Sequence, residues 1–132
     1  MKPARARWLH VSRHPSAKGG TPVIKLAIRM VKPEHENRLR EWMLELSRRS
    51  SEVRETFAQE GVRHEQAFLL KTAGGPVLIY AMEALDHERA AVAYRNSGLP
   101  IDHEHKRVMA QVLGEPANAE LLYECVANED AC

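Results

Sequence analysis

Two glutamates and one histidine are the residues of this chain best suited to general acid–base chemistry. Glu65 and Glu83 fall in two consecutive segments with strand patterns, and His105 falls near the start of a segment with a helix pattern. A carboxyl or imidazole group acts as a general base when burial and neighbouring charges tune its pKa toward the working pH. We therefore interpret Glu65, Glu83 and His105 as candidate catalytic residues.

Four more polar residues are candidate substrate-binding groups: Arg29, Tyr80, Asp102 and Tyr123. Arg29 can hold an anionic group, and Tyr80 can donate a hydrogen bond to a carbonyl. A small-molecule site usually combines an apolar lining with a few convergent polar groups. Tyr80 and Glu83 are an odd number of positions apart, so a regular strand points them to opposite faces. Only a bulge or the end of the strand brings them together.

The same residues also allow a purely structural interpretation. Arg29 then forms an ion pair with a glutamate, and Tyr123 contributes only packing. His105 is then a hydrogen-bonded histidine next to Asp102. Structural roles of this kind are more common than catalytic ones, so both interpretations stay open.

Metal binding is a second hypothesis, because Asp102, His103, Glu104 and His105 are consecutive. On a helix, His103 and His105 point about 200° apart, so they do not easily bind one ion. His64, His105 and a glutamate have the ligand types of a two-histidine, one-carboxylate site. Exposed polar residues at a helix start, with Asp102 as the cap, explain the run without a metal. We predict neither a metal nor a cofactor.

Nucleophilic catalysis has less support. The chain lacks a Gly-x-Ser-x-Gly element, which would place a serine on a sharp turn. Cys125 falls in an expected strand, where burial makes a thiol inert.

The first part of the chain has the pattern of a strand, a long helix and a hairpin. Residues 23–31 alternate with period two. Residues 34–60 carry apolar side chains along one helical face, with a break expected near residues 47–51 and Gly61 as the C-terminal cap. Residues 62–72 and 76–85 then read as two strands of a hairpin.

The second part has the pattern of two short helices and a final strand. Asp86 is the expected N-terminal cap of a helix over residues 87–97, and Asp102 that of a helix over residues 103–113. After a Glu-Pro-Ala-Asn turn, the alternation over residues 119–127 predicts the last strand.

These elements predict an α+β fold of the ferredoxin-like type, with the order β-α-β-β-α-β. Right-handed crossovers then give a four-stranded antiparallel sheet with helices on one face. The face without helices should be polar in a monomer, yet it keeps apolar residues, which we expect to include Ala27, Val31, Leu78 or Val77, and Leu122 or Leu121. An apolar patch of this kind favours a homodimer that packs sheet against sheet.

Three stretches carry a resemblance to a known group of proteins: Gly61-Val-Arg-His-Glu65, Leu78-Ile-Tyr-Ala-Met-Glu83 and Ser97-Gly-Leu-Pro-Ile-Asp102-His-Glu-His105. With them, residues 22–127 resemble the dimeric α+β barrel superfamily, and within it a family of small bacterial domains of unknown function. The resemblance implies the fold and a dimer. It implies no chemistry, because the superfamily includes monooxygenases, isomerases, mutarotases, haem-dependent barrels and stress-response proteins.

Composition agrees with one domain of ordinary type. The 132 residues are 44% hydrophobic and 28% charged, with a net charge of +1. This balance predicts neither nucleic-acid nor membrane binding. Residues 1–21 read as a basic, flexible tail and residues 22–132 as the domain. Both cysteines lie in the last eight residues, so the chain is not a disulfide scaffold, and we expect a cytoplasmic bacterial protein.

We therefore expect an uncharacterised dimeric α+β barrel that binds or converts a small molecule in the barrel interior. The alternative is a structural or protein-interaction module with no ligand, whose interior charges are paired. A cofactor-independent monooxygenase is a third option that rests on the superfamily resemblance alone.

Overall fold

The computed structural model describes residues 21–127 of the chain. Their elements in chain order are β1 (Val23–Val31), a 3₁₀ turn η1 (Pro33–His35), α1 (Glu36–Arg48), α2 (Ser50–Glu60), β2 (Val62–Thr72), β3 (Gly75–Ala84), α3 (His87–Arg95), α4 (Pro100–Val112) and β4 (Leu113–Ala117). The predicted tail over residues 1–21 lies outside the described residues, except for Thr21. Within the described part, no helix is long and apolar enough to cross a membrane.

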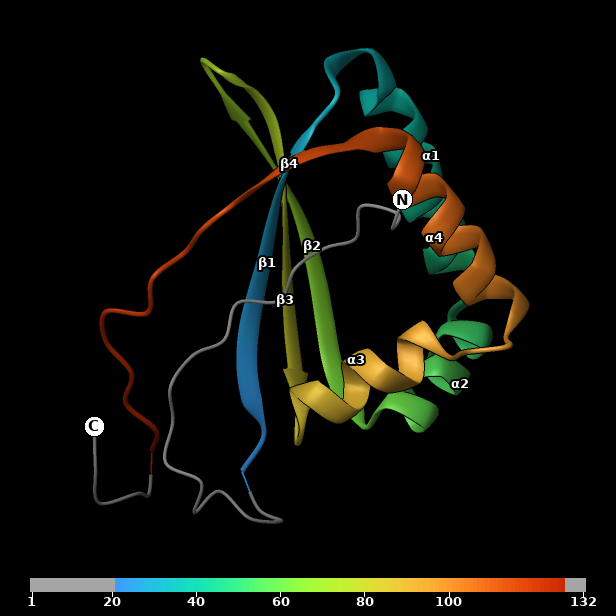
Figure 1. Cartoon of the computed structure of the whole chain (residues 1–132), viewed down its shortest axis with the longest axis vertical. Helices are drawn as coiled ribbons and strands as arrows, with labels where there is room; N and C mark the ends of the chain where they lie inside the picture. Colours follow the sequence, from blue (N-terminus) through green and yellow to red (C-terminus); the bar gives the residue numbers. More distant parts are fainter. Residues whose placement is uncertain (1–20, 128–132) are drawn as a thin grey trace.

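The strands form one open antiparallel sheet in the order β2-β3-β1-β4. Strand β3 pairs along its length with both β1 and β2, whereas β4 pairs only with the second half of β1. All four helices lie on one side of this sheet (Figure 1). The fold is therefore α+β with one covered and one uncovered sheet face.

The predicted long helix is two helices, and the expected break is confirmed at Arg49. Arg49 donates hydrogen bonds to Glu52 in α2 and to Glu104 in α4, the latter at 2.7 Å between Nη2 and Oε2. These bonds anchor the start of α2 to α4. Gly61 ends α2 in the left-handed conformation, with φ of 73°, which glycine adopts without a steric penalty.

Of the two helix caps predicted in the second half of the chain, the Asp86 cap is confirmed and the Asp102 cap is wrong. The side chain of Asp86 accepts a hydrogen bond from the Arg89 amide at 3.1 Å and so caps α3. Helix α4, by contrast, begins at Pro100 with Leu99 as the N-cap residue. Proline is well suited to a first helical turn, where a missing N–H costs nothing. Asp102 therefore lies inside that first turn and is buried.

The last strand lies at Leu113–Ala117 and not at residues 119–127, so this prediction is wrong. The expected turn around Pro116 is the strand itself, in which Pro116 pairs opposite Arg29. A proline is tolerated there because β4 is an edge strand. Residues 118–126 follow without strand pairing to the other residues of the range 21–127, and Cys125 on this segment is exposed and disulfide-bonded rather than a buried thiol in a strand.

The uncovered sheet face is also not composed as expected. Ala27 and Val31 are 1% and 3% exposed and lie in the core with Leu78, under the helices. The uncovered face instead carries the larger apolar side chains of β1, at Ile24, Leu26, Ile28 and Met30, because successive strand residues alternate between faces. Small residues such as Ala27 let the helices approach the sheet closely. The core on that side is completed by residues of α1 and α4, including Leu39, Trp42, Val108, Met109 and Val112.

Candidate functional site

The sheet register separates the two candidate catalytic glutamates. Glu65 pairs opposite Met82, and Ala67 pairs opposite Tyr80, in a regular part of the β2–β3 ladder. Met82 and Tyr80 are buried on the side of the helices, so Glu65 faces the helices as well. Glu83 alternates with these residues and faces the other way. A bulge is present near the start of β2, but β3 is regular there, so Tyr80 and Glu83 are not brought together.

His105 joins three aromatic residues in the space between sheet and helices. Its Nδ1 accepts a hydrogen bond from the indole Nε1 of Trp42 at 2.8 Å. Its Nε2 lies 3.5 Å from the hydroxyl of Tyr80. The ring of Tyr94 is 6.1 Å away from the imidazole, in an edge-on arrangement. These contacts come from α1, α3, α4 and β3, so the tertiary fold positions the histidine.

The indole donor determines which nitrogen of His105 carries the proton. An indole N–H can only donate, so Nδ1 must be the acceptor. Burial lowers the pKa of His105 to about 4, so the imidazole is neutral at pH 7 with its proton on Nε2. That proton faces the hydroxyl of Tyr80. His105 therefore acts as a hydrogen-bond donor here and is poorly suited to be a general base.

Three carboxyl groups approach one another beside the aromatic residues. Burial, followed by the nearby charge of Asp102, raises the pKa of Glu65 to about 7. Burial and the charges of Asp102 and Glu65 raise the pKa of Glu60, the last residue of α2, to about 8. The positive charge of Lys106 partly offsets the rise in pKa of Glu60 and of Asp102. Like charges held in a desolvated space favour the protonated form, so Glu60 and Glu65 exchange protons near neutral pH.

Asp102 is the least solvent-exposed of the three carboxylic acids. It is 5% exposed, and burial raises its pKa although Ser97 hydrogen-bonds to its side chain. Its second oxygen, Oδ2, is buried without a hydrogen-bond partner among the described residues. A buried carboxylate oxygen without a partner is costly, which makes this position a candidate for ligand contact.

We refer to these residues together as the acid–aromatic cluster, which consists of Trp42, Glu60, Glu65, Tyr80, Tyr94, Asp102 and His105. Burial, with the charges of Glu65 and Tyr94, raises the pKa of Tyr80 well above 10, so its hydroxyl stays protonated, and it donates a hydrogen bond to the sulfur of Met43 at 3.9 Å. Glu65, Tyr94 and His105 are half-buried, so solvent reaches one edge of the cluster. The cluster combines a carboxyl group that titrates near pH 7 with an oriented phenol.

Arg29 lies on the helix side of the sheet, but its hydrogen bonds go to the backbone at Gly114 and not to the acid–aromatic cluster. It is 4% exposed, and both its Nε and Nη2 donate to the carbonyl oxygen of Gly114, the former at 2.9 Å. Burial lowers the pKa of its guanidinium, whereas Glu115 has the opposite effect. These hydrogen bonds tie β1 to the start of β4.

Tyr123 and His64 lie away from the cluster. Tyr123 is 77% exposed on the segment that follows β4. His64 pairs with Glu83 in the sheet register and is exposed, while His105 is on the covered side. His64 and His105 therefore do not form one metal site. Within residues 21–127, no group of three or more His, Cys, Asp or Glu side chains is arranged to hold a metal ion.

Sequence reasoning did not select Trp42, Glu60 or Tyr94. Trp42 lies within residues 34–60, whose apolar side chains follow one helical face, and nothing in that local pattern indicates that its N–H meets a histidine. Glu60 precedes a cap glycine and has the sequence signature of a solvent-exposed helix end. The only local signal for Glu60 is its position, one residue before the cap glycine and directly ahead of the next strand, where the chain turns back toward the sheet.

The fold and this cluster define the chain as an α+β open-sheet protein with a buried acid–aromatic cluster between sheet and helices. The chain belongs to DUF6176, a family of unknown function, whose model matches residues 24–131. No curated protein and no solved structure gives a significant match to the chain.

Proposed function

We propose that the protein binds a small molecule at the acid–aromatic cluster and transfers a proton to or from it. The observation that carries this proposal is the carboxyl group of Glu65, whose pKa is raised to about 7 beside the phenol of Tyr80. An acid–base group is most effective when its pKa lies near the working pH. Strongly shifted pKa values also tend to cluster at functional sites.

Each residue of the cluster has a distinct role in this proposal. Glu65 is the proton-transfer group, and the hydroxyl of Tyr80 donates a hydrogen bond to the bound molecule. His105 and Trp42 are positioning residues, because their hydrogen bond holds the Nε2 proton toward Tyr80. Three carboxyl groups in one place favour a neutral or cationic substrate over an anionic one.

The test uses two glutamates of the same sheet. Native mass spectrometry of the protein purified from cells, followed by a thermal-shift screen with small metabolites, identifies a bound compound. We expect Glu65→Gln to abolish its binding or turnover and Tyr80→Phe to weaken it. Glu83→Gln, on the opposite sheet face, is the matched control and should have no effect. If no compound binds any variant, or if Glu83→Gln has the same effect as Glu65→Gln, the proposal is wrong.

The finer fold assignment belongs to the same proposal. The element order, with strands in the order β2-β3-β1-β4, supports a ferredoxin-like topology. The apolar uncovered face supports a homodimer in which two sheets pack face to face, which would close the dimeric α+β barrel. Phe68 and Leu70 of β2 are 49% and 48% exposed on this face, and Ile24 of β1 is 60% exposed.

The same face also favours the alternative function, a protein-interaction module without a ligand. In that case the acid–aromatic cluster would be a structural network only. The native mass spectrum distinguishes the two functions, because the module predicts an empty dimer and a normal fold for Glu65→Gln. A compound bound near Glu65 would exclude the module.

A further inference from the structure

The carboxyl group of Asp102 has one oxygen atom to which the described part of the chain offers no donor. Asp102 is 5% exposed, and its Oδ2 is buried without a hydrogen-bond partner among residues 21–127. The charge of Asp102 acts on both Glu60 and Glu65, so the three carboxyl groups share one space. A buried carboxylate oxygen of this kind is stabilised by a hydrogen-bond donor, which a ligand can supply.

Lys106 places a positive charge at the edge of this space without pairing with any of the acids. It follows Asp102 by four positions on α4, so both residues lie on the same helix face. Its Nζ donates to the carbonyl oxygen of Arg95 at 3.2 Å, at the end of α3, and lies 4.9 Å from the ring centroid of Tyr94. Within residues 21–127, Lys106 forms no salt bridge to a carboxylate. Its ammonium group therefore leaves Oδ2 of Asp102 without a donor.

The position of Lys106 indicates which kind of group this space accepts. An ammonium over an aromatic ring gains a cation–π attraction, and the ring of Tyr94 belongs to the acid–aromatic cluster. Lys106 is half-buried, and one hydrogen bond to the backbone holds its ammonium, so its long side chain can turn out into solvent. The ammonium of a ligand then meets the face of Tyr94 and the carboxylate of Asp102 together.

We propose that the molecule bound at the acid–aromatic cluster is a small primary amine, held as its ammonium cation by the carboxylate of Asp102 and the face of Tyr94. This inference rests on the proposed function and names the class of its substrate. A guanidinium fits less well, because its fork binds a carboxylate through both oxygens and Ser97 already hydrogen-bonds to the Asp102 side chain. An anion is disfavoured because it would approach three carboxyl groups.

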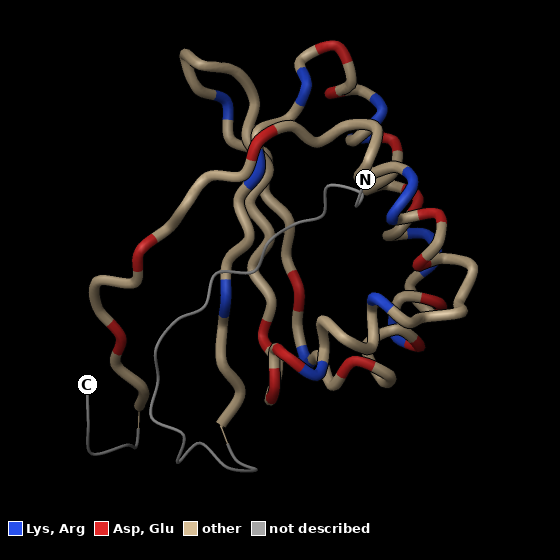
Figure 2. The backbone as a smooth tube through the Cα atoms, in the orientation of Figure 1, with Lys and Arg blue, Asp and Glu red and all other residues tan. Residues whose placement is uncertain are grey.

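The preference for a cation arises locally and not from the charge of the whole surface. The net charge is +1, and Figure 2 shows acidic and basic positions interspersed along the helices. A mixed surface of this kind exerts no strong long-range field on an amine. The buried carboxyl groups supply the preference, because a charge interaction is stronger in a desolvated space than in water.

The first experiment compares three probes of the same chain length and different charge. Backbone ¹H–¹⁵N NMR titrations of the full-length chain at pH 7 measure the dissociation constants of n-butylamine, 1-butanol and butyrate. We expect the amine to shift the amide signals of the first turns of α4 and to bind at least tenfold more tightly than the other two. Equal affinities for the amine and the alcohol would overturn the inference, as would an amine that does not bind.

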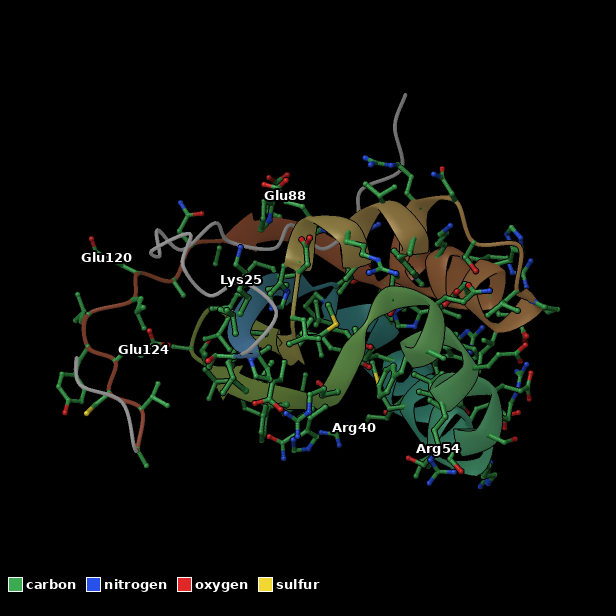
Figure 3. The ribbon with its side chains drawn as sticks, turned by 90° about the horizontal axis from the view of Figure 1, so that it is seen from below. Lys25, Arg40, Arg54, Glu88, Glu120 and Glu124 are labelled. Atoms are coloured by element: carbon green, nitrogen blue, oxygen red, sulfur yellow. The ribbon has the colours of Figure 1, made fainter. Side chains whose placement is uncertain are left out.

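The second experiment removes one charge at a time. Asp102→Asn keeps the shape of the side chain and should abolish amine binding, whereas Lys106→Met removes the neighbouring ammonium and should tighten it at least threefold. The matched controls are Glu88→Gln and Arg54→Met, whose exposed side chains point outward from α3 and α2 (Figure 3). Circular dichroism verifies the fold of each variant. An unchanged affinity in Asp102→Asn, weaker binding in Lys106→Met, or equal effects of the controls would each contradict the inference.

Glu65→Gln separates this inference from the proposed function. Amine binding that requires Asp102 but not Glu65 would support the amine site and contradict the role of Glu65 in the proposed function. A compound whose binding requires Glu65 but not Asp102 would leave the proposed function standing and overturn the amine as its substrate class.

Discussion

At the scale of single residues, burial decides what each polar group can do. His105 and Glu65 are both candidate bases by residue type, yet burial moves their pKa values in opposite directions, to about 4 and to about 7. The histidine loses its proton-accepting role because the indole of Trp42 occupies Nδ1. The glutamate gains one because its carboxyl group titrates near neutral pH.

The stability of the protein should depend on pH through Glu65. Its pKa is about 7 in the folded protein and 4.5 as a free side chain, so the folded state binds the proton more tightly. The stabilisation from this group is therefore present at low pH and lost as the pH rises from about 4.5 through 7. We expect the unfolding free energy of the unchanged chain, relative to Glu65→Gln, to fall by about 1–3 kcal/mol between pH 5 and 8.

Urea denaturation of both proteins at each pH measures this difference. His105 has a lowered pKa and changes stability with the opposite sign between pH 4 and 6.5. The comparison cancels this effect, because both proteins keep His105. Parallel curves for the two proteins across the whole pH range would show that the carboxyl group of Glu65 is not perturbed.

Replacing His105 should destabilise the fold as well as the site. His105→Ala leaves a void and removes the acceptor of the Trp42 indole N–H, so we expect a loss of about 2–4 kcal/mol. His103→Ala, at an exposed position of the same helix, should change stability by less than about 0.5 kcal/mol. Denaturant unfolding monitored by tryptophan fluorescence checks both values. Equal effects of the two substitutions would contradict a buried role for His105.

At the scale of elements, turns and caps place the cluster residues. Gly61 ends α2 in the left-handed conformation and starts β2, and so sets the distance between Glu60 and Glu65. Helix α4 starts at Pro100, three residues before the predicted start at residue 103, and this places Asp102 inside the first turn, where it is buried. The ends of these elements therefore determine which side chains meet.

Gly61→Ala should be destabilising although there is space for a methyl group. No atom lies within 4 Å of the added carbon, but φ is 73°, which costs a non-glycine residue about 1 kcal/mol. Gly98→Ala is the control, because it has the same free space and no positive φ. We expect thermal denaturation to show a lower Tm for Gly61→Ala and an unchanged or higher Tm for the control. A loss of equal size at both glycines would mean that φ is not the cause.

At the scale of the whole molecule, one sheet face lacks the cover that its composition requires. Apolar residues of β1 and β2 lie there in place of the polar residues that a solvated antiparallel sheet face usually carries. Covering this face is worth roughly 25 cal/mol for each Å² of apolar surface removed from water. Self-association through this face is the expected result.

A single charge on the uncovered face should weaken the dimer. Phe68→Glu buries a carboxylate in the proposed interface, so we expect at least a tenfold larger dissociation constant. Val92→Glu on α3 is the control, because Val92 is exposed to a similar extent, 45% against 49% for Phe68. Light scattering over a range of concentrations measures both. Added salt should not weaken an apolar interface of this kind, and strong weakening by salt would indicate an electrostatic one.

Sequence alone determined the elements whose signals are local. The period of β1, the two-helix region before Gly61, the β2–β3 hairpin and the Asp86 cap are confirmed, because each depends on side chains and backbone groups only a few residues apart. The α+β class follows from their order. Among the candidate site residues, Glu65, Tyr80, Asp102 and His105 meet in the structure.

Only the tertiary structure decided which faces are covered and where the chain leaves the sheet. Strand period alone cannot say which side of a strand meets the helices. It therefore cannot place Ala27 under the helices or Glu83 on the uncovered face. The alternation in residues 119–127 has the local signal of a strand, but pairing needs a neighbouring edge, and the described chain pairs residues 113–117 with β1 in its place. The raised pKa of Glu65 and the orientation of His105 arise from contacts between residues distant in sequence, and such contacts exist only once the chain is folded.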